Sequence, residues 1–273
     1  MKVKSTLNDQ PQKTKENVLQ VQYIQPWSNM ICKFKLPDHV FERLWELYDY
    51  TMGIKWKSFG GQLVGQIDEE PEVTPDILEK FPEWGQWCIQ SVEQFIQTQM
   101  SQSVMGSESP DDFFKQKLLT RLTTMWFVNQ KPHEYNPVHV HTNCKVSSVV
   151  YLKTPKNQIK GRKDHYKSDG KITFMNNSGT DPNFSNPQCS FEPKAGDMYI
   201  FPALQHHMVW PYRSTDPDDS RISLSFNADF TSEKQLEAEK KSAEKMYEQM
   251  KKHKESEMKD DKSITDGNIN KSG

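Results

Sequence analysis

Two histidines close together in the chain could bind a metal ion side by side. His139 and His141 are separated by one residue within the segment 138–142, which Pro137 precedes. We expect this segment to be an extended strand, in which residues i and i+2 point to the same face. The two imidazoles would then project together. The alternative is that both are ordinary surface or core histidines.

A third ligand must come from elsewhere in the chain. His206 and His207 follow an apolar run at 198–201, so one of them would stand at the end of a buried strand. A non-haem iron(II) site needs three ligands on one face, with open positions for substrate and oxygen. The pattern therefore predicts a three-ligand metal site inside a β structure.

A cation suited to a carboxylate stands further along. In the segment 221–228 the polar residues Arg221, Ser223 and Ser225 alternate with apolar ones. We expect Arg221 and Ser223 to point the same way, into the interior of a barrel. There the planar guanidinium could hold a ligand carboxylate in two places. The alternative is a surface arginine at the start of a strand.

The remaining pattern supplies the elements that would position these residues. Apolar residues at helical spacing predict one helix from Asp38 and a second from about Asp76. After residue 117 the period becomes that of strands, and the expected strands cover 118–129, 138–142, 145–153, 171–175, 197–201, 207–211 and 221–228. Short strands without intervening helices indicate an antiparallel barrel or sandwich, so the predicted fold is mainly β with flanking helices (α+β).

Composition divides the chain into three parts. Residues 1–22 are polar and expected to be disordered. Residues 23–230 should form a single domain, with its β core at about 118–230. Residues 231–273 begin as a helix former with opposite charges four residues apart, and the end should be a disordered tail.

Charge and composition exclude several classes of function. The net charge of −2 gives no reason to expect nucleic acid as a partner. No apolar run is long enough to cross a bilayer, and the first residues lack the apolar stretch of a secretory signal, so we expect no membrane association. The four cysteines are widely spaced, which favours the cytoplasm. Cys144 lies near the histidines, but a lone cysteine is more often a small buried apolar group than a ligand.

Several motifs of the segment 118–230 follow one another in a recognisable order. They are Trp126-x-x-Asn129, His139-Val-His141 with SSVVYL at 147–152, Gly196-x-x-x-x-Phe201-Pro202, His207-x-Val209-x-Pro211 and Arg221-x-Ser223-x-x-Phe226-Asn227. Together they resemble the 2-oxoglutarate/iron(II) oxygenases of bacteria and their phages. The resemblance implies a double-stranded β-helix, or jelly roll, and a cytoplasmic enzyme (in the host cytoplasm if phage-encoded).

The resemblance also implies an iron site. Its Fe(2+) ligands would be His139, His141 and His207. His207 fits the family's His-x-Val-x-Pro frame, whereas His206 does not. The wider superfamily has Asp or Glu where His141 stands. A carboxylate elsewhere could therefore be the true third ligand, and Glu134 and Asp164 are candidates.

The implied cosubstrates are 2-oxoglutarate and O2. Arg221 looks like the clamp for the distal carboxylate of 2-oxoglutarate, with Ser223 assisting. Tyr151 and Asn129 are weaker candidates for cosubstrate binding. The implied reaction is hydroxylation of a C–H bond with decarboxylation of 2-oxoglutarate to succinate.

Two other functions compete with this one. A cupin-type metal dioxygenase needs no 2-oxoglutarate, but it would carry a Glu four or five residues after His141, where Lys145 and Val146 stand. A non-catalytic metal-binding jelly-roll protein is the other alternative. The substrate, a small molecule or a protein, and the oligomeric state are not readable. We expect the N-terminal helices and the basic loop 154–170 to shape access to the site.

Overall fold

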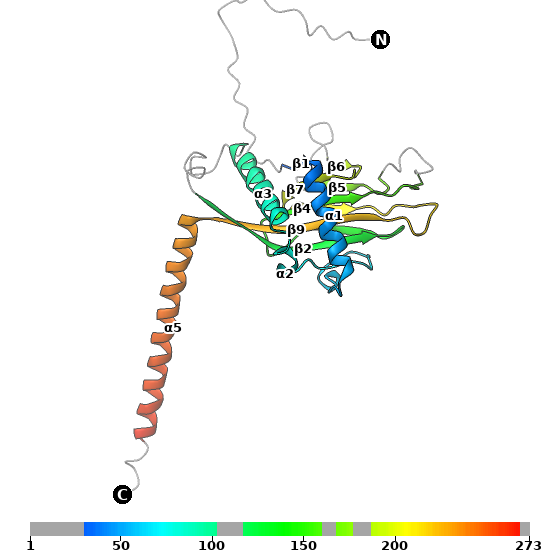
Figure 1. The fold of residues 1–273 in the computed structure, drawn as a ribbon. Coiled ribbons are helices and arrows are strands. Elements are labelled where there is room, and N and C mark those ends of the chain that lie inside the picture. The colour runs from blue at the N-terminus through cyan, green and yellow to red at the C-terminus, as the bar shows by residue number, and fades with distance from the viewer. Residues whose placement is uncertain (1–29, 103–116, 160–167, 177–186, 268–273) are drawn as a thin grey trace, which may run out of the picture.

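The computed structural model describes residues 30–102, 117–159, 168–176 and 187–267 (Figure 1). Its strands are β1 (Cys32–Lys35), β2 (Leu118–Gln130), β3 (Asn136–His139), β4 (Val146–Lys153), β5 (Ile172–Met175), β6 (Gln188–Phe191), β7 (Asp197–Pro202), β8 (His207–Val209) and β9 (Arg221–Ser232). Its helices are α1 (Asp38–Gly53), the 3-10 turn η1 (Gly60–Gln62), α2 (Pro75–Leu78), α3 (Pro82–Gln102) and α5 (Glu233–Gly267). The expected tail at 1–22 lies outside the described residues.

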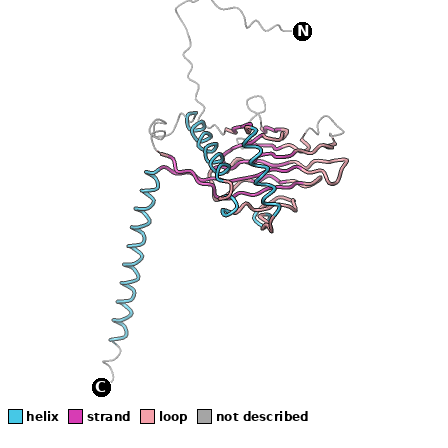
Figure 2. The backbone as a smooth tube through the Cα atoms, viewed as in Figure 1, coloured by secondary structure: helices cyan, strands magenta, loops and turns pink. Residues whose placement is uncertain are grey.

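The strands form two antiparallel sheets. A five-stranded sheet has the order β1-β7-β4-β9-β2, and a four-stranded sheet has the order β3-β8-β5-β6. The strands run side by side through the body of the molecule (Figure 2). This is the jelly roll with flanking helices that the sequence predicts, and the expected fold class is confirmed.

Helices α1 and α3 pack on one face of the five-stranded sheet. Leu44 and Leu47 of α1 and Val92 of α3 are fully buried, and they belong to the same apolar core as Phe127 and Val150 of the sheet. Each large apolar side chain removed from water in this way contributes about 1.5–3 kcal/mol. This helical layer leaves the other face of the sheet to form a pocket.

Successive side chains of β2 and β9 point alternately to the helix-covered face of the sheet and to the pocket face. Phe127 and Leu224 point into the helix-covered core, whereas Val128, Gln130 and Ser223 line the pocket. The strands pair in a register that places Gln130 opposite Arg221 and Val128 opposite Ser223. The side-chain period of two therefore fixes which residues can reach a bound molecule.

Several elements differ from those expected. The helix expected from about Asp76 is two helices, because the chain breaks before Pro82. Strands β1 and β6 were not expected; they are short edge strands that pair with β7 and β5. The strand at 138–142 was misplaced, since β3 begins at Asn136 and ends at His139.

The last helix extends away from the sheets (Figure 1). Strand β9 continues to Ser232, and α5 begins at the next residue. Nearly all side chains of α5 are exposed as far as they are described, to Lys251, and Leu236 is only partly buried. None of the described helices is both long and apolar enough to cross a membrane.

Candidate metal centre and cosubstrate pocket

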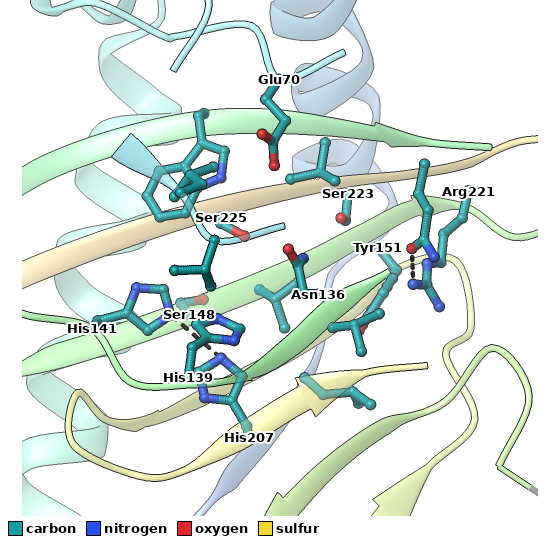
Figure 3. Close-up of a pocket in the computed structure, with 18 of the residues that line it drawn as sticks. Glu70, Asn136, His139, His141, Ser148, Tyr151, His207, Arg221, Ser223 and Ser225 are labelled. Carbon is teal, nitrogen blue, oxygen red and sulfur yellow. Dashed lines mark hydrogen bonds between the residues drawn. The ribbon is translucent and has the colours of Figure 1, made fainter. Parts of the chain in front are cut away.

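A pocket lies between the two sheets (Figure 3). Its floor comes from β2, β4 and β9 of the larger sheet, and β3, β5 and β8 of the smaller sheet close the other side. Residues Leu63 and Val64 of the segment before α2 add one wall.

Three histidines meet at one end of this pocket. They are His139, His141 and His207, and one ring nitrogen of each lies within 4.8 Å of the other two. The Nε2 atoms of His141 and His207 are 3.4 Å apart. Among the described residues, no other group of three or more His, Cys, Asp or Glu side chains has this geometry. The arrangement suits one ion bound to three nitrogens.

His141 reaches the cluster from a different backbone position than expected. His139 ends β3 and pairs with His207 of β8, so these two face each other across neighbouring strands. His141 lies just beyond β3, where its N–H donates to the carbonyl of Ala203 at 2.9 Å. His141 therefore lies beyond the strand that was expected to carry it, but its ring still projects beside that of His139, with ring centroids 5.3 Å apart.

Hydrogen bonds set the tautomer of two of these rings. His139 Nδ1 lies 2.7 Å from the carbonyl oxygen of Pro137, and His207 Nδ1 lies 2.9 Å from that of Gln205. A carbonyl oxygen can only accept, so both Nδ1 atoms carry a hydrogen. In the neutral rings each Nε2 then keeps a free lone pair, which is the form that ligates metals.

Burial keeps all three rings neutral. It lowers the pKa of His139, and burial together with the neighbouring His139 lowers the pKa of His141 to about 4. The pKa of His207, which is only 4% exposed, is lowered well below its usual value by burial and by the other two histidines. Protons therefore do not compete with a metal near neutral pH.

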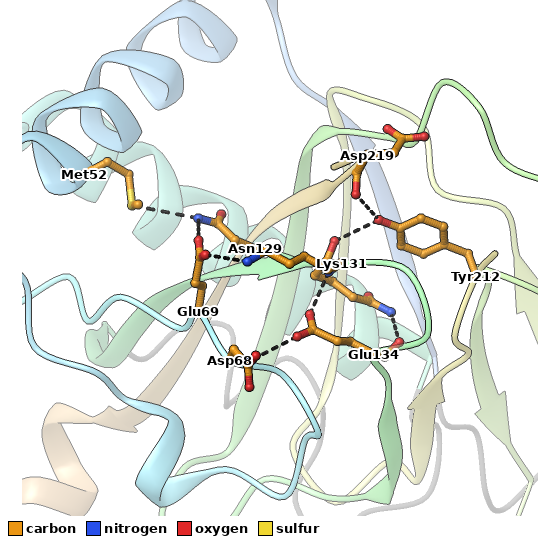
Figure 4. A network of polar contacts seen from close by, with 9 residues as sticks. Met52, Asp68, Glu69, Asn129, Lys131, Glu134, Tyr212 and Asp219 are labelled. Atoms are coloured by element: carbon orange, nitrogen blue, oxygen red, sulfur yellow. Dashed lines mark hydrogen bonds and ion pairs between the residues drawn. The ribbon is translucent and has the colours of Figure 1, made fainter. Parts of the chain in front are cut away.

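The carboxylate alternatives do not join this cluster where they can be located. Glu134 accepts from the backbone N–H of Lys131 at 2.6 Å and from that of Asp68 at 3.2 Å (Figure 4). Asp164 lies outside the described residues. Cys144 is not part of the histidine group, and burial raises the pKa of its thiol to about 11.

Arg221 lines the same pocket and is 2% exposed. Its guanidinium donates to the carbonyl of Gly170 at 2.5 Å and to Oε1 of Gln130, the residue opposite it on β2. Neither partner is charged, and none of the ion pairs found among the described residues involves Arg221. A buried cation without a counter-anion is costly, and a ligand carboxylate would remove that cost.

Two further residues on this side of the pocket are Tyr151 and Ser223. They lie opposite each other on β4 and β9, and both line the pocket. Arg221 lies 5.9 Å from the Tyr151 ring centre. The buried Tyr151 hydroxyl has no hydrogen-bond partner among the described residues. It is therefore a free donor beside the buried cation.

Asn129 does not share this location. Its side chain lies on the helix-facing side of β2, where Nδ2 donates to Glu69 at 3.3 Å and contacts Met52 Sδ at 3.9 Å (Figure 4). The next residue, Gln130, faces the pocket instead. Our sequence reasoning missed Gln130, although the alternation along β2 could have found it. It also missed Glu70, for which no motif gave a signal.

Residues 124–227 match the model of a family described as "Putative 2OG-Fe(II) oxygenase". This part of the chain is similar to that oxygenase family. The match covers the whole jelly-roll segment from the middle of β2 to β9, including the three histidines and Arg221. The resemblance seen in the sequence is thereby confirmed for this segment, and the cofactors of that family are Fe(2+), 2-oxoglutarate and O2.

Comparison with solved structures matches this chain to several oxygenases. One is a 2OG-Fe(II) oxygenase family oxidoreductase from Burkholderia pseudomallei, with 14% identity, a TM-score of 0.32, and coverage of 43% of this chain and 48% of that one. A prolyl-4-hydroxylase from Pseudomonas putida has 14% identity, a TM-score of 0.42, and coverage of 74% and 94%. A prolyl hydroxylase from Trichoplax adhaerens has 10% identity, a TM-score of 0.43, and coverage of 73% and 83%. This chain thus spans about half the length of the Burkholderia protein. No curated protein matches the sequence.

The residues of this pocket fit both groups that the family binds. Three neutral imidazoles with converging nitrogens are a donor set for iron(II). The uncompensated guanidinium of Arg221 and the free hydroxyl of Tyr151 are a donor set for a carboxylate. Both sets line one pocket, so a molecule held by the second can reach the first.

Proposed function

We propose that the protein is an Fe(II)- and 2-oxoglutarate-dependent dioxygenase that hydroxylates a C–H bond of its substrate. 2-Oxoglutarate would be decarboxylated to succinate, with one oxygen atom of O2 entering succinate and the other entering the product. The observation that carries this proposal is the shared pocket, with a neutral, largely buried three-histidine cluster at one end and Arg221, which has no counter-ion among the described residues, further along.

His139, His141 and His207 would hold the iron. The carbonyl groups of Pro137 and Gln205 orient two of the rings, so the lone pairs are aimed before the metal arrives. Bound iron supplies a site at which 2-oxoglutarate and O2 react. Three neutral ligands leave the full positive charge of the ion in place, which favours binding of an anionic cosubstrate.

Arg221 would bind the distal carboxylate of 2-oxoglutarate, with donors from Tyr151 and Ser223 beside it. Gln130 holds the guanidinium in position through its side-chain oxygen. Because these groups are buried, water does not compete for the carboxylate, and the cosubstrate is fixed in one orientation.

Anaerobic addition of iron(II) and then 2-oxoglutarate tests this function. We expect a metal-to-ligand charge-transfer band in the visible range that needs both additions. A cupin-type dioxygenase or a non-catalytic jelly roll would bind the metal without this band. Succinate formation on admission of O2, measured even without a substrate, would then separate an enzyme from a binding protein.

A further inference from the structure

Glu70 is a buried carboxylate that neither the metal cluster nor the cosubstrate site uses. Its side chain is 1% exposed and lines the pocket, with the carboxylate directed into it (Figure 3). Oε1 has no hydrogen-bond partner among the described residues. A buried carboxylate oxygen without a partner is costly, and at a pocket wall a bound molecule could supply the missing partner.

The charges around Glu70 make this site negative. Burial, and then the neighbouring Glu134, raise the pKa of Glu70 to about 7. The nearby Lys131 does not compensate it, because its ammonium group is bound to Glu69 at 2.9 Å. None of the ion pairs found in the described part of the chain includes Glu70. A cation arriving from outside would therefore be attracted here.

The walls near Glu70 are apolar and aromatic. Trp126 lines the pocket and stacks on Phe59 with ring centroids 4.8 Å apart, and Leu63 and Val128 lie in the same region. Trp126 also lies close to the metal cluster, because the centroid of its ring is 6.1 Å from the centroid of the His141 ring. An aliphatic chain along Trp126 would thus connect a group at Glu70 with the histidines, and an ammonium group there would also gain from the indole face.

We propose that Glu70 selects the substrate by binding a cationic nitrogen, namely a primary ammonium group carried on an aliphatic stem that lies against Trp126. This inference rests on the proposed function in one respect, which is that the bound molecule is called a substrate. The geometry of Glu70 and Trp126 is independent of the metal. An anionic or uncharged group in the same place would leave the carboxylate unpaired and would be rejected.

The test uses n-pentylammonium as the probe and n-pentanol as its uncharged counterpart. Both are titrated calorimetrically into the full chain at about pH 8.5, where an alkylammonium is still charged. The titration is done with and without iron(II) and 2-oxoglutarate under nitrogen. The variants are Glu70→Gln and, as a control for net charge, Glu42→Gln, which changes an exposed carboxylate on α1.

We expect the wild type and Glu42→Gln to bind pentylammonium alike, and Glu70→Gln to bind it at least about tenfold more weakly, as for loss of a charge-assisted hydrogen bond. Pentanol should bind the wild type and Glu42→Gln more weakly than pentylammonium does, and it should bind Glu70→Gln no more weakly than it binds the wild type. Melting curves establish that each variant is folded. Equal ammonium affinity in wild type and Glu70→Gln, or no binding by the wild type, would overturn the inference. Glu70-dependent binding without a charge-transfer band would instead overturn only the proposed oxygenase function.

Discussion

His139 and His207 lie directly opposite each other on the paired strands β3 and β8, with ring centroids 4.2 Å apart. They are 68 positions apart in the sequence (207 − 139), and the pairing of β3 with β8 brings them together. Each ring is fixed by a main-chain carbonyl two residues before it. The pair is therefore built into the sheet, and His141 completes the cluster from the following segment.

Removal of one histidine should abolish tight metal binding. We expect His207→Ala to weaken iron(II) affinity by more than about 100-fold. Mutation of a residue that only hydrogen-bonds to a metal ligand already weakens metal affinity by about 10–100-fold, and loss of the ligand itself should cost more. His206→Ala is the matched control, since His206 adjoins His207 in the chain but is not in the cluster. Anaerobic titration against a competing chelator measures both. An equal loss in His206→Ala would show that the cluster is not the binding site.

Arg221 should control the affinity for 2-oxoglutarate. Arg221→Ala should cost about 2–5 kcal/mol of cosubstrate binding, and Arg221→Lys less, because lysine keeps the charge but not the two-pronged geometry. Iron affinity should change little. Arg121→Ala, which removes an arginine that is 76% exposed on β2, is the control. Unchanged cosubstrate dissociation constants at fixed iron(II) would remove the main reason to prefer this oxygenase over a cupin.

Tyr151 offers a test that separates binding from stability. Tyr151→Phe removes a buried hydroxyl that has no partner among the described residues, so the melting temperature of the free protein should stay the same or rise. The affinity for 2-oxoglutarate should fall by about tenfold, as for one hydrogen bond to a charged group. Differential scanning calorimetry and the charge-transfer titration measure the two effects. A lower melting temperature with unchanged affinity would assign Tyr151 a structural role.

The sequence was most informative where side-chain period and motif spacing act together. The alternation from Arg221 to Ser225 correctly predicted the pocket face of β9, because one buried face fixes the register of a strand. The expected strand at 138–142 extended too far, since nothing local marks the end of β3 at His139. That end depends on the short partner β8.

Other parts of the site depend on contacts that no local pattern contains. Asn129 was predicted because it belongs to a motif, but its side chain points toward the helix-covered face of β2, whereas that of Gln130 points into the pocket. Glu70 lies in irregular chain before α2, where Phe59 N–H donates to its carbonyl at 2.8 Å. Its burial results from packing of that segment along β2, which periodicity cannot predict.

The end of the chain should be dispensable for the site. The described side chains of α5 from Glu237 to Lys251 are exposed, and the predicted boundary near residue 230 lies within β9. A chain ending at about residue 254 should therefore keep its melting temperature and its metal affinity. A chain ending within β9, before Ser232, is the contrasting case and should be destabilised, because it removes pairs with β2. Loss of stability in the first chain would show that the tail packs on the domain.

Glu70 should make stability depend on pH in a direction opposite to that of an ion-paired carboxylate. Its pKa is raised from 4.5 to about 7 in the folded protein, so the folded state holds this proton more tightly than the unfolded state. The stability due to the neutral carboxyl is thus fully present below about pH 4.5 and is lost as the pH rises through 7. Gln imitates the neutral form at every pH. Glu70→Gln should therefore match the wild type near pH 4 and exceed it near pH 8 by up to about 3 kcal/mol, at about 1.4 kcal/mol per pKa unit.

Urea unfolding of wild type, Glu70→Gln and the exposed control Glu42→Gln at both pH values measures this difference. Pentylammonium at pH 8 should reduce the gap, because it stabilises the ionised Glu70 of the wild type and has no partner in Glu70→Gln. The control should track the wild type throughout. If Glu70→Gln were instead less stable than the wild type at pH 8, Glu70 would have a favourable partner within the fold, and its carboxylate would not be available to a ligand.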